Sequence, residues 1–356
     1  MRTKISNWMA NIGLFLFSTT LVLLVAEIGV RFLIPMQVDE RTLMFSSHTF
    51  QLDQNGAVRY QPNKNIRTIA VYDNKIEYDV HFDTNNLGLA DGKNYEYENL
   101  ANKRYYAFVG DSFTAGFHGG EPWVPKLRRN IDGENIEIFN LGVSGTGIEH
   151  FYRLLQGTSE QLHITHIVIL AISEDIRRNS WYPLTNSTEI RFCQKNTPSP
   201  ECIKRPYIAK IIHPASSSED ILKVAEEIIK DREKNPQRSG ITGFLRQSEL
   251  LVFVVRSLKT MLLYEERYSL DALRNIREAF PLAEIYFMHL PQKQEVANGG
   301  YFLNNLGNEI EEIGISYFPA LKECHWQMDM FFVHDSHPNS VGYDNIRKCV
   351  SSYIFR

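Results

Sequence analysis

The chain has 356 residues, enough for one large hydrophobic core or two modest ones. Hydrophobic residues make up 43% and charged residues 22%, which is typical of a globular protein and excludes a chain disordered throughout. The formal net charge of -4 argues against a nucleic-acid-binding protein. A short basic run at Lys126, Arg128 and Arg129 is typical of a solvated helix face.

The first 35 residues differ from the rest of the chain. From Trp8 to Ala26 the sequence reads WMANIGLFLFSTTLVLLVA, without a charged residue. A helix rises about 1.5 Å per residue, so this segment would span about 28 Å, close to the hydrocarbon thickness of a bilayer. No small-residue cleavage pattern follows it, and Arg2 and Lys4 precede it. We therefore expect residues 1–35 to be a single-pass signal-anchor in the inner (plasma) membrane, with the remaining chain on the periplasmic or extracytoplasmic side.

The four cysteines fit an exported domain. Cys193 and Cys202 bracket a short proline-containing segment that they would close into a small loop, and Cys324 and Cys349 form a second possible pair. Neither pair has the spacing of zinc ligands, so a metal site is the weaker interpretation. We expect neither a metal nor a cofactor.

After the anchor, residues 36–103 form a polar stretch with strand-like pieces at 66–72 and 75–82. We expect this N-terminal extension to pack on the main domain. Residues 104–356 then alternate short apolar runs with segments of helical period, interrupted at about 176–265 by an insertion with two helical segments, 221–234 and 249–266. The predicted strands are 105–110, 136–143, 166–172, 283–291 and 315–320, and the predicted helices are 122–131, 147–157, 270–280, about 302–313 and the segment after Pro338.

Alternating strands and helices predict a mostly parallel sheet with helices on both faces. In such sheets, sites form at the carboxyl ends of the strands. The first core strand is followed by Gly110-Asp111-Ser112, where a serine hydroxyl would be presented for nucleophilic attack. The tripeptide alone favours the other interpretation, a turn serine that caps the next helix.

Glycines follow the second predicted strand in the sequence NLGVSGTG, residues 140–147. They permit close approach of a ligand to the backbone, so the Gly145 N–H is a candidate oxyanion donor beside the N–H of Ser112. A tight turn that needs positive φ explains the same glycines, and the two explanations are compatible. The spacing does not match a dinucleotide-binding fingerprint.

The third block is Asp335-Ser336-His337-Pro338, near the C-terminus. His337 would accept the proton of Ser112, and Asp335 would orient the imidazole and stabilise its charged form. His334 and His150 are rival bases, but neither has the same Asp-x-His-Pro setting.

In combination, GDSFTAG (110–116), NLGVSGTG (140–147) and DSHPNSVG (335–342) resemble the Ser, Gly and Asp-x-His blocks of the SGNH/GDSL hydrolase superfamily, over about residues 104–353. HFDTNNLGLAD (81–91) resembles the extension of membrane-anchored bacterial members, and HLPQKQEV (289–296) resembles the segment before their last catalytic loop. The resemblance implies a flavodoxin-like three-layer α/β/α fold. It also implies ester or acyl chemistry on lipids, glycans or acetylated polysaccharides.

One block departs from the family pattern. The family usually has an asparagine before an aspartate after the third strand, as a side-chain oxyanion donor, and Glu174 stands at the matching position. Losing one such donor costs about 3–4 kcal/mol in the barrier. Glu174 would therefore be protonated, or Ser173 or Asn179 would replace the donor, or the activity would be slow or altered. An alignment shifted by one residue would place Ser173 at this position.

The expected function is a Ser-His-Asp esterase, with O-acetyl groups of an envelope glycan as a candidate substrate. An O-acyltransferase would use the same triad with a sugar hydroxyl as the acceptor. A catalytically weak glycan-binding or scaffold protein is the third possibility. We expect the membrane, but no nucleic acid, as a partner.

Overall fold

The computed structural model divides the chain into two compact units, Met1–Glu40 with Glu226–Glu265, and Arg41–Ala225 with Glu266–Arg356. The residues that it describes are 2–33, 42–47, 49–53, 56–96, 103–131, 135–159, 161–177, 180–183, 190–193, 210–234, 250–251, 254, 268–303 and 305–355.

The first unit contains one long helix, α1 (Arg2–Leu33). Its Glu27 carboxylate accepts a hydrogen bond from the Leu250 backbone N–H, at 3.0 Å. Within the part of the chain that the structure describes, no helix combines the length and apolarity needed to cross a membrane. The predicted membrane-spanning segment is therefore not confirmed.

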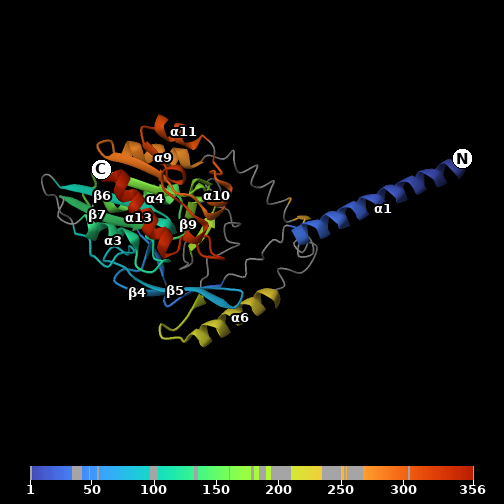
Figure 1. Cartoon of the computed structure of the whole chain (residues 1–356), viewed down its shortest axis with the longest axis horizontal. Coiled ribbons are helices and arrows are strands. Elements are labelled where there is room, and N and C mark those ends of the chain that lie inside the picture. The colour runs from blue at the N-terminus through green and yellow to red at the C-terminus, as the bar shows by residue number, and fades with distance from the viewer. Residues whose placement is uncertain are drawn as a thin grey trace. The chain divides into compact units, whose positions relative to one another are not determined.

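A five-stranded sheet forms the centre of the second unit (Figure 1). Its strands lie in the order β13-β12-β8-β6-β7, and every neighbouring pair is parallel. Numbered along the chain and read from the β7 edge, this order is 2-1-3-4-5, that of a flavodoxin-like doubly wound sheet. The strands are β6 (Arg104–Gly110), β7 (Ile136–Gly142), β8 (His166–Ala171), β12 (Glu284–His289) and β13 (Ser316–Pro319).

Alternate side chains of the strands enter two separate cores, because successive residues of a strand point to opposite faces. Tyr105, Ala107 and Val109 of β6 pack with residues of α4 and α9, whereas Tyr106 and Phe108 pack with residues of α3 and α13. The predicted mostly parallel sheet with helices on both faces is confirmed. The four helices are α3 (Trp123–Asn130), α4 (Ile148–Ser159), α9 (Tyr268–Ala279) and α13 (Ser340–Ile354).

Seven further helical elements accompany this framework within the described residues, and several begin at the carboxyl ends of strands. They are α2 (Ser112–Ala115), α5 (Ser173–Arg177), α6 (Ser218–Lys234), α10 (Lys293–Asn298), α11 (Leu306–Glu312), α12 (Ala320–Glu323) and a 3-10 turn at Met328–Met330. Of the predicted insertion helix 249–266, only residues 250, 251 and 254 are described. Two short strands of the insertion, β9 (Ser180–Pro183) and β10 (Ile190–Cys193), pair antiparallel.

Strands of the N-terminal extension and β11 of the insertion form a second, mostly antiparallel sheet in the order β11-β1-β4-β5, beside a separate hairpin of β2 and β3. The strands predicted at 66–72 and 75–82 correspond to β4 and β5. The strands are β1 (Thr42–Phe45), β2 (Phe50–Leu52), β3 (Val58–Tyr60), β4 (Asn65–Tyr72), β5 (Lys75–Asp83) and β11 (Lys210–Ile211).

A buried network joins this extension to the parallel sheet. Asp91 accepts two hydrogen bonds from Arg128, at 2.7 and 2.8 Å, and one from the Tyr95 hydroxyl at 2.6 Å. Asn140 of β7 donates its side-chain amide to the Ala90 carbonyl. The interpretation of Arg128 as part of a solvated helix face is therefore wrong, because its charge is paired with a carboxylate that is only 1% exposed.

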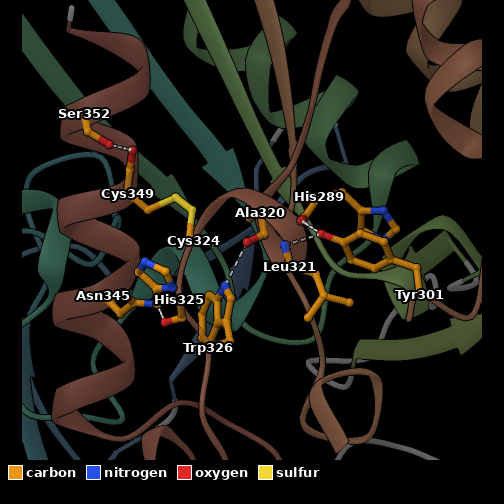
Figure 2. The surroundings of a disulfide bond; sticks show 10 residues. All are labelled: His289, Tyr301, Ala320, Leu321, Cys324, His325, Trp326, Asn345, Cys349 and Ser352. Atoms are coloured by element: carbon orange, nitrogen blue, oxygen red, sulfur yellow. Dashed lines mark hydrogen bonds between the residues drawn. A yellow bond between two sulfur atoms is a disulfide. The ribbon is translucent and has the colours of Figure 1, made fainter. Parts of the chain in front are cut away.

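A disulfide between Cys324 and Cys349 connects the residue after α12 to α13, with 5.9 Å between the Cα atoms (Figure 2). It is the second of the two possible pairs. Around it, Trp326 donates to the Ala320 carbonyl and Asn345 donates to the His325 carbonyl. The other possible pair involves Cys202, which lies outside the described residues.

Candidate active site

Ser112 lies at the carboxyl end of β6, as the first residue of α2. The Asp111 side chain accepts the Phe113 N–H at 2.8 Å and so fixes the start of this short helix. The turn requires glycine at position 110, since a Cβ there would lie 2.0 Å from Thr114 Oγ1 and 2.4 Å from the Leu170 carbonyl oxygen. Ser112 thus lies in the tight turn between β6 and α2.

His337 connects Ser112 to Asp335, although 225 residues separate the histidine from the serine. The distance from His337 Nε2 to Ser112 Oγ is 2.8 Å. His337 Nδ1 lies against Asp335 Oδ1, which also accepts the His337 backbone N–H at 2.9 Å. Asp335 is 2% exposed and Ser112 is 5% exposed. The structure therefore brings all three predicted residues together in one hydrogen-bonded chain.

The loop that carries Asp335 and His337 is held at both ends. The Phe332 N–H donates to the His337 carbonyl at 3.1 Å, and the Lys293 ammonium donates to the Phe332 carbonyl at 2.6 Å. Beyond the loop, Asn339 caps α13 by accepting the N–H groups of Val341 and Gly342. These contacts restrict the loop and hence the direction of the imidazole.

The two rival histidines occupy other places. His150 is buried against Val58 of the extension, where the Val58 N–H donates to its Nε2 at 2.8 Å. Burial lowers the pKa of His150 to about 3. His334 faces away from the serine toward Glu77, with Nδ1 2.9 Å from a carboxylate oxygen. Neither is placed to accept a proton from Ser112.

His118, which the sequence analysis did not identify, packs against the triad. The His118 ring stacks on the His337 ring, with 3.9 Å between centroids and 11° between planes. Tyr343 of α13 contacts His118 Nδ1 through its hydroxyl, which also donates to the Ser112 carbonyl at 3.3 Å. No sequence motif distinguishes His118, because its partner is distant in the sequence.

The second glycine-rich loop follows β7, as predicted. Gly145 has a φ of +77°, which favours glycine and accounts for the residue independently of any chemistry. Tyr60 of β3 fixes the preceding residue, since its hydroxyl accepts the Ser144 N–H at 2.8 Å and donates to Ser144 Oγ at 3.0 Å. The extension thus contacts the loop that contains the candidate oxyanion donor.

The segment after β8, which departs from the family pattern, also differs from what we expected of Ser173. Its hydroxyl lies in a fully buried cluster, where it donates to Glu295 and lies 3.0 Å from His289 Nε2. Burial lowers the pKa of His289 to about 3, so this cluster contains a neutral imidazole. Ser173 as a replacement oxyanion donor is therefore wrong. Glu174 is exposed on α5, and Asn179 lies outside the described residues.

This arrangement is suited to nucleophilic chemistry. An imidazole in contact with a hydroxyl on one side and a buried carboxylate on the other can accept a proton and hold the resulting charge. The hydroxyl then becomes a nucleophile at neutral pH.

A scan against protein-family models and a search of curated proteins found no match. Among solved structures, the psychrotrophic esterase EstA from Pseudoalteromonas sp. is 15% identical, with 71% of this chain and 97% of that chain covered and a TM-score of 0.36. A lipase/acylhydrolase from Enterococcus faecalis is 12% identical over 70% of this chain and 95% of its own, with a TM-score of 0.35. AlinE4, an SGNH-hydrolase family esterase, is 13% identical over 72% and 97%, with a TM-score of 0.33. The matched structures include members of the family that the three sequence blocks resemble, and the function is argued below from the triad itself.

Proposed function

We propose that the chain is a serine hydrolase that cleaves carboxylic esters through an acyl-enzyme intermediate. The observation that carries the proposal is the position of His337, which contacts Ser112 Oγ at 2.8 Å and the buried Asp335 carboxylate at the same time. A serine that only capped a helix would need neither contact.

In the first half-reaction, Ser112 Oγ attacks the ester carbonyl carbon while its proton passes to His337 Nε2. The negative charge that develops on the carbonyl oxygen is held by the N–H groups of Ser112 and Gly145. The tetrahedral intermediate collapses, the C–O bond to the leaving group breaks, and His337 returns the proton to the leaving alcohol. Water then attacks the acyl-serine by the same route and releases the carboxylic acid.

For the substrate, we propose O-acetyl groups of an envelope glycan, which fits an enzyme located outside the cytoplasm. The Cys324–Cys349 disulfide supports this location, since disulfides persist in oxidising compartments. The apolar run of residues 8–26 and its basic N-terminal flank support a single-pass anchor in the plasma membrane. Leu14, Phe15 and Phe17 of α1 are each about two-thirds exposed, which favours an apolar environment for this helix.

Turnover of p-nitrophenyl acetate by the full chain tests the proposal, together with labelling of Ser112 by a fluorophosphonate. We expect hydrolysis and labelling by the wild type, and a loss of at least about 10³-fold in Ser112→Ala and in His337→Ala. His81→Ala is the control, because it removes an exposed histidine that contacts the Asn65 side chain and not the serine.

The alternatives give different results in the same assays. A wild type that is labelled but hydrolyses slowly, and whose turnover increases when a sugar acceptor is added, would be an O-acyltransferase. A chain that is neither labelled nor active but still binds acetylated glycan would contradict the hydrolase and favour a scaffold protein.

A further inference from the structure

The β4–β5 hairpin of the extension ends next to the catalytic loop. The turn between the strands has two residues, Asp73 and Asn74, with φ values of +46° and +57°. Two such residues form the tight turn that matches the twist of a hairpin, and Asn and Asp tolerate it better than most residues. Tyr72 is the last residue of β4 and pairs with Lys75 across this turn. We call residues 72–77 the hairpin tip.

A β-bulge changes the direction of one side chain in the hairpin tip. Ala70 pairs with Tyr78 and Val71 pairs with Ile76, so Glu77 is the extra residue of β5. Its carboxylate accepts the His334 backbone N–H at 2.8 Å and contacts His334 Nδ1 at 2.9 Å. Burial by itself would raise the pKa of Glu77, but hydrogen bonds from the His334 side chain and backbone outweigh it and lower the pKa. The charged form of Glu77 therefore holds the residue before Asp335.

Tyr72 reaches Asp335 itself. Its hydroxyl donates to Asp335 Oδ2 at 2.9 Å, while the other carboxylate oxygen, Oδ1, faces His337. The ring of Tyr72 also stacks on His334, with 5.9 Å between centroids and 20° between planes. The two oxygens of the buried carboxylate thus contact different side chains, Tyr72 and His337. Together these contacts restrict rotation of the carboxylate.

We propose that Tyr72 is a positioning residue of the active site, which holds Asp335 so that Oδ1 faces the imidazole of His337. This inference rests on the proposed hydrolase function and extends its hydrogen-bonded chain to four residues. It also makes the N-terminal extension a part of the active site.

The proposal follows from what the Tyr72 hydroxyl does chemically. It donates one directed hydrogen bond to an ionised carboxylate, and such bonds are stronger than those between neutral groups. Without this bond, the carboxylate can rotate about its Cβ–Cγ bond and present a poorer acceptor to His337. The imidazole would then be oriented correctly toward Ser112 for a smaller part of the time. The rate of the reaction would therefore fall, whereas the affinity for the substrate would be unchanged.

Four variants of the full chain test the role of Tyr72, with the rate of Ser112 labelling by a fluorophosphonate and kcat and KM for p-nitrophenyl acetate as readouts. We expect Tyr72→Phe to lower kcat and the labelling rate about tenfold, with KM unchanged. In an Asp335→Asn background, the same substitution should change either rate less than about twofold, because two residues that act through one contact are not additive. The variants are Tyr72→Phe, Asp335→Asn, the double variant and the control Tyr95→Phe.

Tyr95→Phe is a matched control, since Tyr95 also lies in the extension and donates its hydroxyl to a buried carboxylate, that of Asp91. We expect it to lower the melting temperature and to leave kcat and the labelling rate within about twofold of wild type.

Two results would overturn the inference alone, in a wild type that is labelled and active. One is a Tyr72→Phe variant with wild-type rates. The other is a tenfold decrease that persists in the Asp335→Asn background, which would show that Tyr72 does not act through Asp335. A wild type that is neither labelled nor active would instead overturn the proposed hydrolase function, and this inference with it.

Discussion

At the scale of single residues, the sequence resemblance predicts that Glu174 stands where an asparagine would donate to the oxyanion, and this prediction can be tested. Ser173 is turned into the buried cluster with Glu295 and His289 and cannot supply the missing donor. We therefore expect Glu174→Asn to increase kcat for p-nitrophenyl acetate by at least about tenfold, because an amide donates where a carboxylate repels. Glu174→Gln controls for the loss of charge, and an unchanged kcat in Glu174→Asn would show that this position does not face the oxyanion.

The three triad residues could be found in the sequence because each lies in a short motif. Ser112 follows a strand next to glycine, and Asp335 and His337 are two residues apart before a proline. His118 and Tyr72 could not be found in this way. Their contacts join positions 225 and 263 residues apart, to Tyr343 and Asp335, and depend on how the sheets pack.

At the scale of elements, the disulfide between Cys324 and Cys349 closes a loop across 25 residues that includes the catalytic loop. A cross-link of this length stabilises the folded state by about 3 kcal/mol, since it restricts the unfolded chain. We expect Cys324→Ser/Cys349→Ser to lower the free energy of unfolding by this amount in urea titrations. Dithiothreitol should lower the free energy of unfolding of the wild type at least as much. If dithiothreitol lowers it equally in the wild type and in the double variant, the disulfide assignment is contradicted.

The order of strands and helices was predictable because apolar runs and helical periods alternate clearly from residue 104 onward. The contacts of the extension with the parallel sheet could not be predicted in this way. Arg128 reads as one of several basic residues on a helix, and only the position of Asp91 shows that its charge is paired inside the molecule. The bulge at Glu77 was equally hidden, because it depends on the register between β4 and β5.

At the scale of the whole molecule, two buried histidines, His150 and His289, contribute to the pH dependence of stability. The pKa of His150 and of His289 is lowered to about 3 by burial, whereas an unfolded histidine titrates near pH 6.5. Between these values the unfolded chain binds more protons than the folded one, so stability is present above about pH 6.5 and is lost as the pH falls. The two together should cost about 4 kcal/mol between pH 7 and pH 5.

Urea unfolding at the two pH values measures this effect. His150→Gln should lose about half as much stability between pH 7 and pH 5 as the wild type, after its lower stability at pH 7 is subtracted. His81→Gln, in which the replaced histidine is exposed, should follow the wild type. A wild-type free energy of unfolding that is the same at both pH values would contradict the assignment of neutral buried histidines.

Ser112 and His337 are 225 residues apart, so the ribosome synthesises them at different times. A ribosome adds about 5–20 residues per second, so His337 is synthesised roughly 10–45 s after Ser112. The extension and most of the parallel sheet exist before the last catalytic loop does. If Ser112 is the nucleophile that we propose, a growing chain would have no base beside it until the segment with His337 has been synthesised and has folded.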